Sequence, residues 1–125
     1  MSNLVDIESV RPIHVWGDVV RARRIEGERV TLALVELAPD AHVPEHRHAA
    51  EQLGMVIQGS VQFRIDDEVR ELGPGGTWRI VGEHPHEVHA GPAGAVVIDV
   101  FNPVRDDWNA LPTSDARPAP WPANG

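Results

Sequence analysis

The chain has 125 residues, of which 42% are hydrophobic and 24% are charged, and its formal net charge is −8. These values fit one compact domain with a single core, and the negative charge disfavours nucleic acid or an anionic membrane as a partner. Cys, Lys and Tyr are absent, which excludes disulfides, thiolate ligands, cysteine nucleophiles and lysine Schiff bases.

Short strand signals recur along the chain between turn residues. Turns are expected at Pro39-Asp40, Asp66-Asp67 and residues 73–76, and Gly59-Ser60 is expected to form a two-residue hairpin turn. No longer segment shows convincing helical periodicity, so the pattern predicts an all-β barrel or sandwich. The expected strands cover residues 30–37, 53–58, 61–65, 69–72, 77–81, 86–90 and 95–101.

The C-terminal segment differs in composition from the rest of the chain. We expect residues 1–111 to form one domain with an N-terminal strand, and residues 112–125 to form a Pro-rich tail. Such a composition is typical of a linker or a loose end. An ordered tail would need a surface to pack against, either the barrel or a second subunit.

Two histidine clusters carry the most specific chemical signal. On an extended strand, His46 and His48 would point to the same side, and Gln52 follows closely enough to add an amide oxygen. A further nitrogen could come from the second cluster, at residues 84–89. Neutral imidazole is a common ligand of Zn, Fe, Ni and Cu, so these segments predict a metal site.

The spacing of these residues resembles that of the small single-domain cupins, over roughly residues 28–105. The first cupin motif runs Gly, five residues, His-x-His, three or four residues, Glu, six residues, Gly. His46, His48 and Gly59 match it, while Asp40 stands at the first Gly position and Gln52 replaces Glu.

The second cupin motif runs Gly, five residues, Pro-x-Gly, two residues, His, three residues, Asn. Gly75 and His86 match it, whereas Val81, Glu83 and Ala90 stand at the Pro, second Gly and Asn positions. The resemblance implies a double-stranded β-helix, or jelly roll, with one divalent metal ion. The implied metal ligands are His46, His48, Gln52 and His86.

The implied ligand set contains no carboxylate. Three neutral imidazoles and an amide would leave the full divalent charge in the pocket, which would attract a small anionic substrate. Gln52 could instead orient a water molecule. Such ligands suit Ni, Zn, Fe, Mn and Cu alike, so the identity of the metal stays open.

Residues outside this set have plainer expected roles. His14 and His42 are expected at the surface or the barrel mouth, His84 at the pocket rim, and His89 on the strand face opposite His86. The four tryptophans are expected to be core or interface anchors rather than sugar platforms; they are Trp16, Trp78, Trp108 and Trp121.

Residues 97–108 resemble the C-terminal signature of the pectin-degradation cupins, which open the ring of unsaturated uronates. The functional Asp, Phe and Arg of that signature fall on Asp99, Phe101 and Arg105. The resemblance implies that Asp99 transfers protons, that Phe101 shapes the pocket wall and that Arg105 clamps a substrate carboxylate.

Two of these roles have structural alternatives. Asp99 lies in an apolar strand, where burying a carboxylate is costly unless it is hydrogen-bonded, so a backbone amide or an arginine could satisfy it. Arg105 could pair with Asp106 or Asp107 instead of a substrate.

We therefore expect a metal-dependent isomerase or ring-opening enzyme for a small sugar acid. A metal-dependent dioxygenase and a non-catalytic binding or sensory cupin are the alternatives. The N-terminus lacks the basic start and apolar run of a signal peptide, and a cytoplasmic homodimer is expected, with barrel edge strands in its interface.

Overall fold

The fold is described for residues 2–122 by a computed structural model. Residue 1 of the expected barrel and residues 123–125 of the expected tail lie outside the described part. Two short 3-10 turns, η1 (Ile7–Ser9) and η2 (Asp106–Ala110), flank the strands. The strands are β1 (Ile13–Trp16), β2 (Val20–Glu26), β3 (Thr31–Leu37), β4 (His42–His46), β5 (Glu51–Ile65), β6 (Glu68–Leu72), β7 (Thr77–Ile80) and β8 (His86–Asn102).

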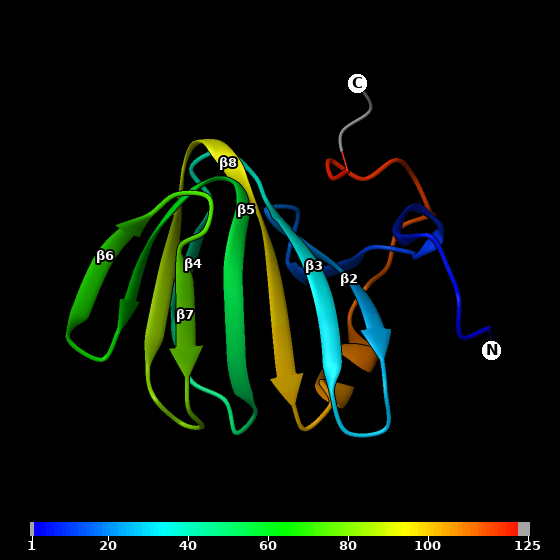
Figure 1. The fold of residues 1–125 in the computed structure, drawn as a ribbon, viewed down its shortest axis with the longest axis horizontal. Coiled ribbons are helices and arrows are strands. Elements are labelled where there is room, and N and C mark those ends of the chain that lie inside the picture. Colours follow the sequence, from blue (N-terminus) through cyan, green and yellow to red (C-terminus); the bar gives the residue numbers. More distant parts are fainter. Residues whose placement is uncertain (1, 123–125) are drawn as a thin grey trace.

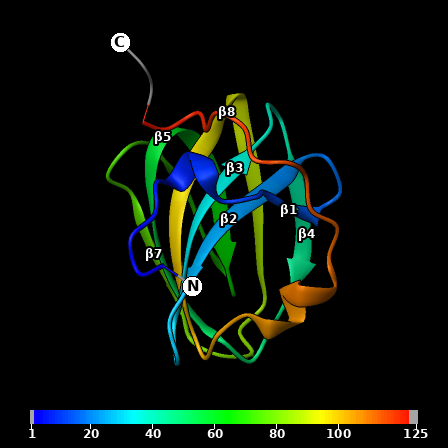
Figure 2. The same cartoon turned by 90° about the vertical axis from the view of Figure 1, so that its right-hand side faces the viewer.

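Two long strands organise the barrel. Strands β5 and β8 pair with each other along most of their length, and all the pairings are antiparallel. The first half of β5 also pairs with β7 and its second half with β6, while the two halves of β8 pair with β4 and β3. The strands curl around one interior, as Figures 1 and 2 show. The predicted all-β jelly-roll fold is confirmed.

The predicted hairpin turn at Gly59-Ser60 is wrong. Both residues lie inside β5, where irregular pairing with β8 on either side of Gly59 bends the strand without reversing it; β-bulges bend strands in this way. Gly59 has a φ of 75°, and a Cβ there would overlap the Gly94 carbonyl oxygen. Gly59 is therefore needed for the bend and the close backbone approach inside β5, and the sequence alone does not distinguish this use of glycine from a hairpin turn.

The backbone keeps a glycine-type conformation where the cupin motifs have glycine. Asp40 and Glu83 occupy two of these positions and have φ angles of 59° and 66°, while Gly59 and Gly75 have 75° and 89°. Asp is one of the residues that enter this left-handed region most readily. The Gly-to-Asp and Gly-to-Glu changes thus preserve the local chain path.

The C-terminal tail packs against the barrel of its own chain. Thr113 forms a β-bridge with Ile13, and the buried Arg23 side chain donates a hydrogen bond to the Arg117 carbonyl oxygen at 2.9 Å. Figure 2 shows the tail running across this side of the barrel. The ordered tail therefore does not require a second subunit. Within residues 2–122, no helix has the length and apolar character needed to cross a bilayer.

Candidate functional site

The barrel encloses a cavity of about 270 Å³. Valine, leucine, phenylalanine and tryptophan side chains form most of its wall, and a few polar side chains point into it. An apolar pocket with a small number of convergent polar groups is the usual form of a small-molecule site. The polar residues include His46, His48, Gln52, His86, Asp99 and Arg105.

Three of these polar residues form a histidine cluster. One ring nitrogen of each of His46, His48 and His86 lies within 4.8 Å of the others. Their Nδ1 atoms donate hydrogen bonds to the carbonyl oxygens of Pro44 (2.9 Å), Ala50 (2.8 Å) and His84 (2.9 Å). Because a carbonyl only accepts, each Nδ1 carries the proton and each Nε2 presents a lone pair.

The His86 ring shows that this cluster fits a metal ion. His86 is 3% exposed, and its Nε2 atom is buried without a hydrogen-bond partner among residues 2–122. Burial lowers the pKa of His86 to about 4 and also lowers the pKa of His48, so both rings are neutral near pH 7. An unpartnered buried lone pair is costly, and a metal ion at this position would satisfy it.

Gln52 is oriented toward the same point. Its amide nitrogen donates to Asp99 Oδ1 at 2.9 Å, which turns its Oε1 toward His48 Nε2 at 3.1 Å. With the His48 proton on Nδ1, both facing atoms are acceptors. A shared cation would stabilise two facing lone pairs, so Gln52 could join the three histidines as a ligand.

Asp99 lies behind Gln52 and is 5% exposed. Its Oδ1 atom accepts from Gln52 and from Trp78 Nε1 at 2.8 Å. Burial raises the pKa of Asp99 to about 6, although both hydrogen bonds act in the opposite direction. The partners of Asp99 are thus two side chains, neither a backbone amide nor an arginine. Trp78 was missed as a site residue, although the alternation of β7 directs Trp78 and Ile80 inward.

Arg105 lies at the edge of the cavity and forms a two-pronged ion pair. Its Nε and Nη2 atoms donate to the two carboxylate oxygens of Asp107 at 3.0 and 2.9 Å. The guanidinium carbon lies 4.7 Å from the ring centre of the buried Phe101 and 4.8 Å from that of Trp108. Stacking and pairing hold the guanidinium in place. Asp107 does not engage the Nη1 atom.

The remaining histidines lie outside the cavity wall. His14 contacts the Gly17 carbonyl oxygen, and His84 contacts Asp66. His42 and His89 stack on each other on the outside of the barrel.

Three of the four tryptophans line the cavity, and Trp121 is exposed outside it. Trp78 and Trp108 are buried. Trp16 is 37% exposed and lines the cavity, with its ring centre 5.4 Å from that of His46. Trp16 is therefore a residue of the cavity wall, and its expected role as a core or interface anchor stays a prediction.

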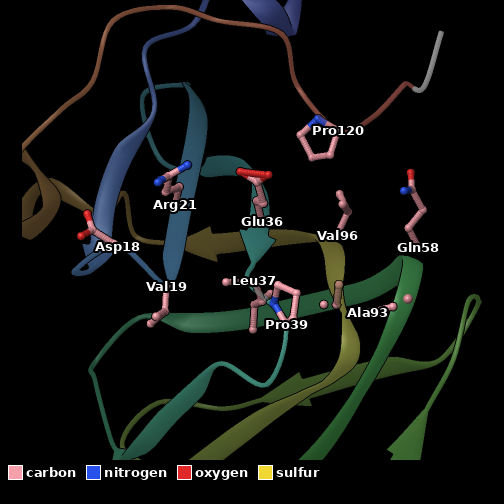
Figure 3. A pocket seen from close by; sticks show the side chains of 14 residues that line it. Asp18, Val19, Arg21, Glu36, Leu37, Pro39, Gln58, Ala93, Val96 and Pro120 are labelled. Atoms are coloured by element: carbon pink, nitrogen blue, oxygen red, sulfur yellow. The ribbon is translucent and has the colours of Figure 1, made fainter.

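A second hollow, of about 410 Å³, lies beside the end of β3 and the middle of β8 (Figure 3). Asp18, Arg21, Glu36 and Pro120 are among the residues around it. None of the histidines contributes to its wall. Its size alone does not make it a reaction site, and the smaller cavity holds the clustered chemical groups.

Comparisons with known proteins agree with this geometry. The cupin domain family profile matches residues 33–101. The pectin degradation protein KdgF of Dickeya dadantii (strain 3937) is 29% identical over 104 residues, which cover 82% of this chain and 94% of that protein. The structure of KdgF from Halomonas sp. aligns with a TM-score of 0.68 and 26% identity, covering 71% of this chain and 84% of that one.

A more distant structure shows the fold alone. The RmlC-like cupin from Shewanella frigidimarina NCIMB 400 aligns with a TM-score of 0.78 at 18% identity, covering 86% of this chain and 96% of that one. The family profile, the jelly-roll topology and the KdgF similarity lead to the same assignment: the chain belongs to the cupin domain family.

Proposed function

We propose that this cupin is a metal-dependent isomerase that opens the ring of an unsaturated uronate or a similar small sugar acid. The observation that carries the proposal is the buried Asp99 carboxyl, hydrogen-bonded to Gln52 beside the three-histidine cluster in one cavity. The similarity to two KdgF proteins, one of them named for pectin degradation, supports the substrate class.

The Nε2 atoms of His46, His48 and His86, with Gln52 Oε1, would hold a divalent metal ion. When bound, the metal would supply Lewis acidity toward a substrate carbonyl or hydroxyl oxygen. The ligand atoms carry no formal charge, so these side chains would leave the positive charge of the site available to an anionic substrate.

Asp99 is the proposed proton carrier. Ring opening of an unsaturated uronate takes a proton from the hemiacetal hydroxyl, breaks the bond between the hemiacetal carbon and the ring oxygen, and delivers a proton to a carbon of the ring double bond, without an oxidant. Oδ1 of Asp99 is occupied by the Gln52 and Trp78 donors, so Oδ2 would accept and return the proton. Positioned acid-base groups typically contribute 10²–10⁴-fold to a rate.

Arg105 would bind the substrate carboxylate. Its Nη1 atom is not used by Asp107, and a substrate carboxylate could also replace Asp107 in the fork. Phe101 is buried beneath the guanidinium. It would form part of the cavity wall and hold the Arg105 guanidinium in position by stacking.

The apolar wall favours a second candidate, a metal-dependent dioxygenase. Most of the residues that line the cavity are hydrophobic, and a substrate less polar than a uronate would fit such walls well. Strict dependence of turnover on Fe(II), with oxygen uptake, would identify this activity.

The test follows the loss of ultraviolet absorbance of an unsaturated uronate. Asp99→Asn should lower kcat by about 10²–10⁴-fold, and Arg105→Ala should mainly raise KM, because it removes binding shared by the ground and transition states. Asp67→Asn, in the exposed turn between β5 and β6, is the matched control and should behave as wild type.

The wild-type rate decides the proposal. If the wild type does not exceed the spontaneous rate, the ring-opening function is wrong. Oxygen uptake would then favour the dioxygenase, and stoichiometric binding without turnover would favour a binding cupin. If Asp99→Asn is as fast as an active wild type, the proton-transfer role of Asp99 is wrong.

A further inference from the structure

A second group of metal-binding side chains lies on the outer surface of the barrel. His42 on β4 pairs directly across from His89 on β8, and Glu87 precedes His89 by two residues. Residues two apart on a strand share one face, so Glu87 and His89 both point outward. His86 lies on the other face and lines the cavity. Figure 2 shows β4 in the barrel wall, at the right-hand edge of the view.

The donor atoms of His42, Glu87 and His89 converge. The two imidazole rings stack with their centres 4.0 Å apart and their planes at 8°. Glu87 Oε2 lies 2.5 Å from His42 Nε2 and 3.7 Å from His89 Nε2, and one ligand atom of each residue lies within 4.8 Å of the others. Two ring nitrogens and one carboxylate oxygen therefore lie close together, and the stacked rings must tilt apart for both nitrogen lone pairs to meet at one ion.

This arrangement is close to the geometry that an ion requires. Ligands bound at about 2.0–2.2 Å to one zinc ion lie roughly 3–3.5 Å from each other. The side chains of His42 and His89 are 45% and 47% exposed, so both rings have room to tilt out of the stack toward that geometry.

Arg64 holds the carboxylate in a suitable orientation. Its Nη2 atom donates to Glu87 Oε1 at 3.2 Å and to Glu45 at 2.7 Å. The other oxygen of Glu87, Oε2, is the one that faces the two imidazoles. Outer partners of this kind orient metal-binding carboxylates in proteins.

We propose that His42, Glu87 and His89 form a second site for a divalent transition metal ion, separate from the histidine cluster in the cavity. Two imidazoles and one carboxylate suit Zn, Ni or Cu, whereas Ca and Mg prefer oxygen ligands alone. The exposure of the two rings leaves at least one coordination position open to water. This site does not depend on the proposed function.

Calorimetric titration of the chelator-treated full chain with ZnCl₂ tests the proposal. The wild type should bind two ions with different affinities. His42→Ala and His89→Ala should each weaken one event by at least about tenfold, since even an outer partner of a ligand is worth 10–100-fold in affinity. The variant with both His46→Ala and His86→Ala should keep that event.

His84→Ala is the matched control, because the His84 side chain is 46% exposed and also lies beside a carboxylate, Asp66, at 2.8 Å. It should leave both events unchanged. Circular dichroism should show that each variant is folded. His42→Ala and His89→Ala should weaken the same binding event, so each variant serves as a check on the other.

Two results would overturn the proposal. One is that the variant lacking both His46 and His86 binds no Zn²⁺ while folded. The other is that His42→Ala and His89→Ala both titrate as His84→Ala does.

Discussion

Asp99→Asn should stabilise the metal-free protein near pH 7 and have little effect near pH 4. Burial raises the pKa of Asp99 from 3.8 to about 6, a shift of about two units, which corresponds to up to about 3 kcal/mol. The folded state holds a neutral carboxyl at low pH, and this stability is lost as pH rises through the folded pKa. Asparagine is neutral throughout, and its Oδ1 can still accept from Gln52 and Trp78.

Urea unfolding of chelator-treated wild type and variant at pH 4 and pH 7 measures the effect. Asp107→Asn is the contrasting control, because the Arg105 hydrogen bond lowers the pKa of Asp107. The stability contributed by the ionised Asp107 is present above the pKa of the unfolded state and is lost as pH falls through the folded pKa. Asp107→Asn should therefore lower the free energy of unfolding at pH 7. If the wild type is as stable as Asp99→Asn at pH 7, the argument from the buried carboxyl is wrong.

Two further predictions concern packing and assembly. A Cβ at Gly54 would overlap Trp78 Nε1 and Asp99 Oδ1, whereas one at Gly73 would meet nothing within 4 Å. Gly54→Ala should therefore lower the free energy of unfolding in urea by about 1–3 kcal/mol. Gly73→Ala should change it by no more than about 0.5 kcal/mol, and equal effects of the two variants would contradict this packing. Light scattering at micromolar concentration should show a homodimer, because Leu32 and Leu53 are 44% and 47% exposed and lie on one sheet face, on either side of Val100. Leu53→Asp should give monomers and Val69→Asp, on the exposed β6, should not; a monomeric wild type would contradict the assembly.

The positions of the cavity residues were predictable from the sequence where they depend on strand alternation or on motif spacing. Strand alternation places Asp99 and Phe101 on one inward face. The glycine positions of the motifs were also predictable, because the backbone has a positive φ there even where Asp40 and Glu83 replace glycine. The histidine cluster follows from the same spacing, because β4 and β8 are paired neighbours in which His46 lies opposite His86.

The other features depend on contacts between distant segments. Nothing near Asp99 in sequence indicates Trp78, which reaches it from β7 because β5 carries Gly54 between them. The choice of Asp107 over Asp106 by Arg105 depends on the conformation of η2. The outer group of His42, Glu87 and His89 requires the register between β4 and β8, which no single strand pattern reveals.

Anomalous diffraction from crystals grown with a divalent zinc salt, recorded at the zinc edge, tests the central claim most directly. We expect a peak about 2.0–2.1 Å from the Nε2 atoms of His46, His48 and His86, with Gln52 Oε1 at a similar distance. A fully ordered cavity with no peak among these histidines, in crystals whose protein binds zinc in solution, would contradict the assignment of the metal centre.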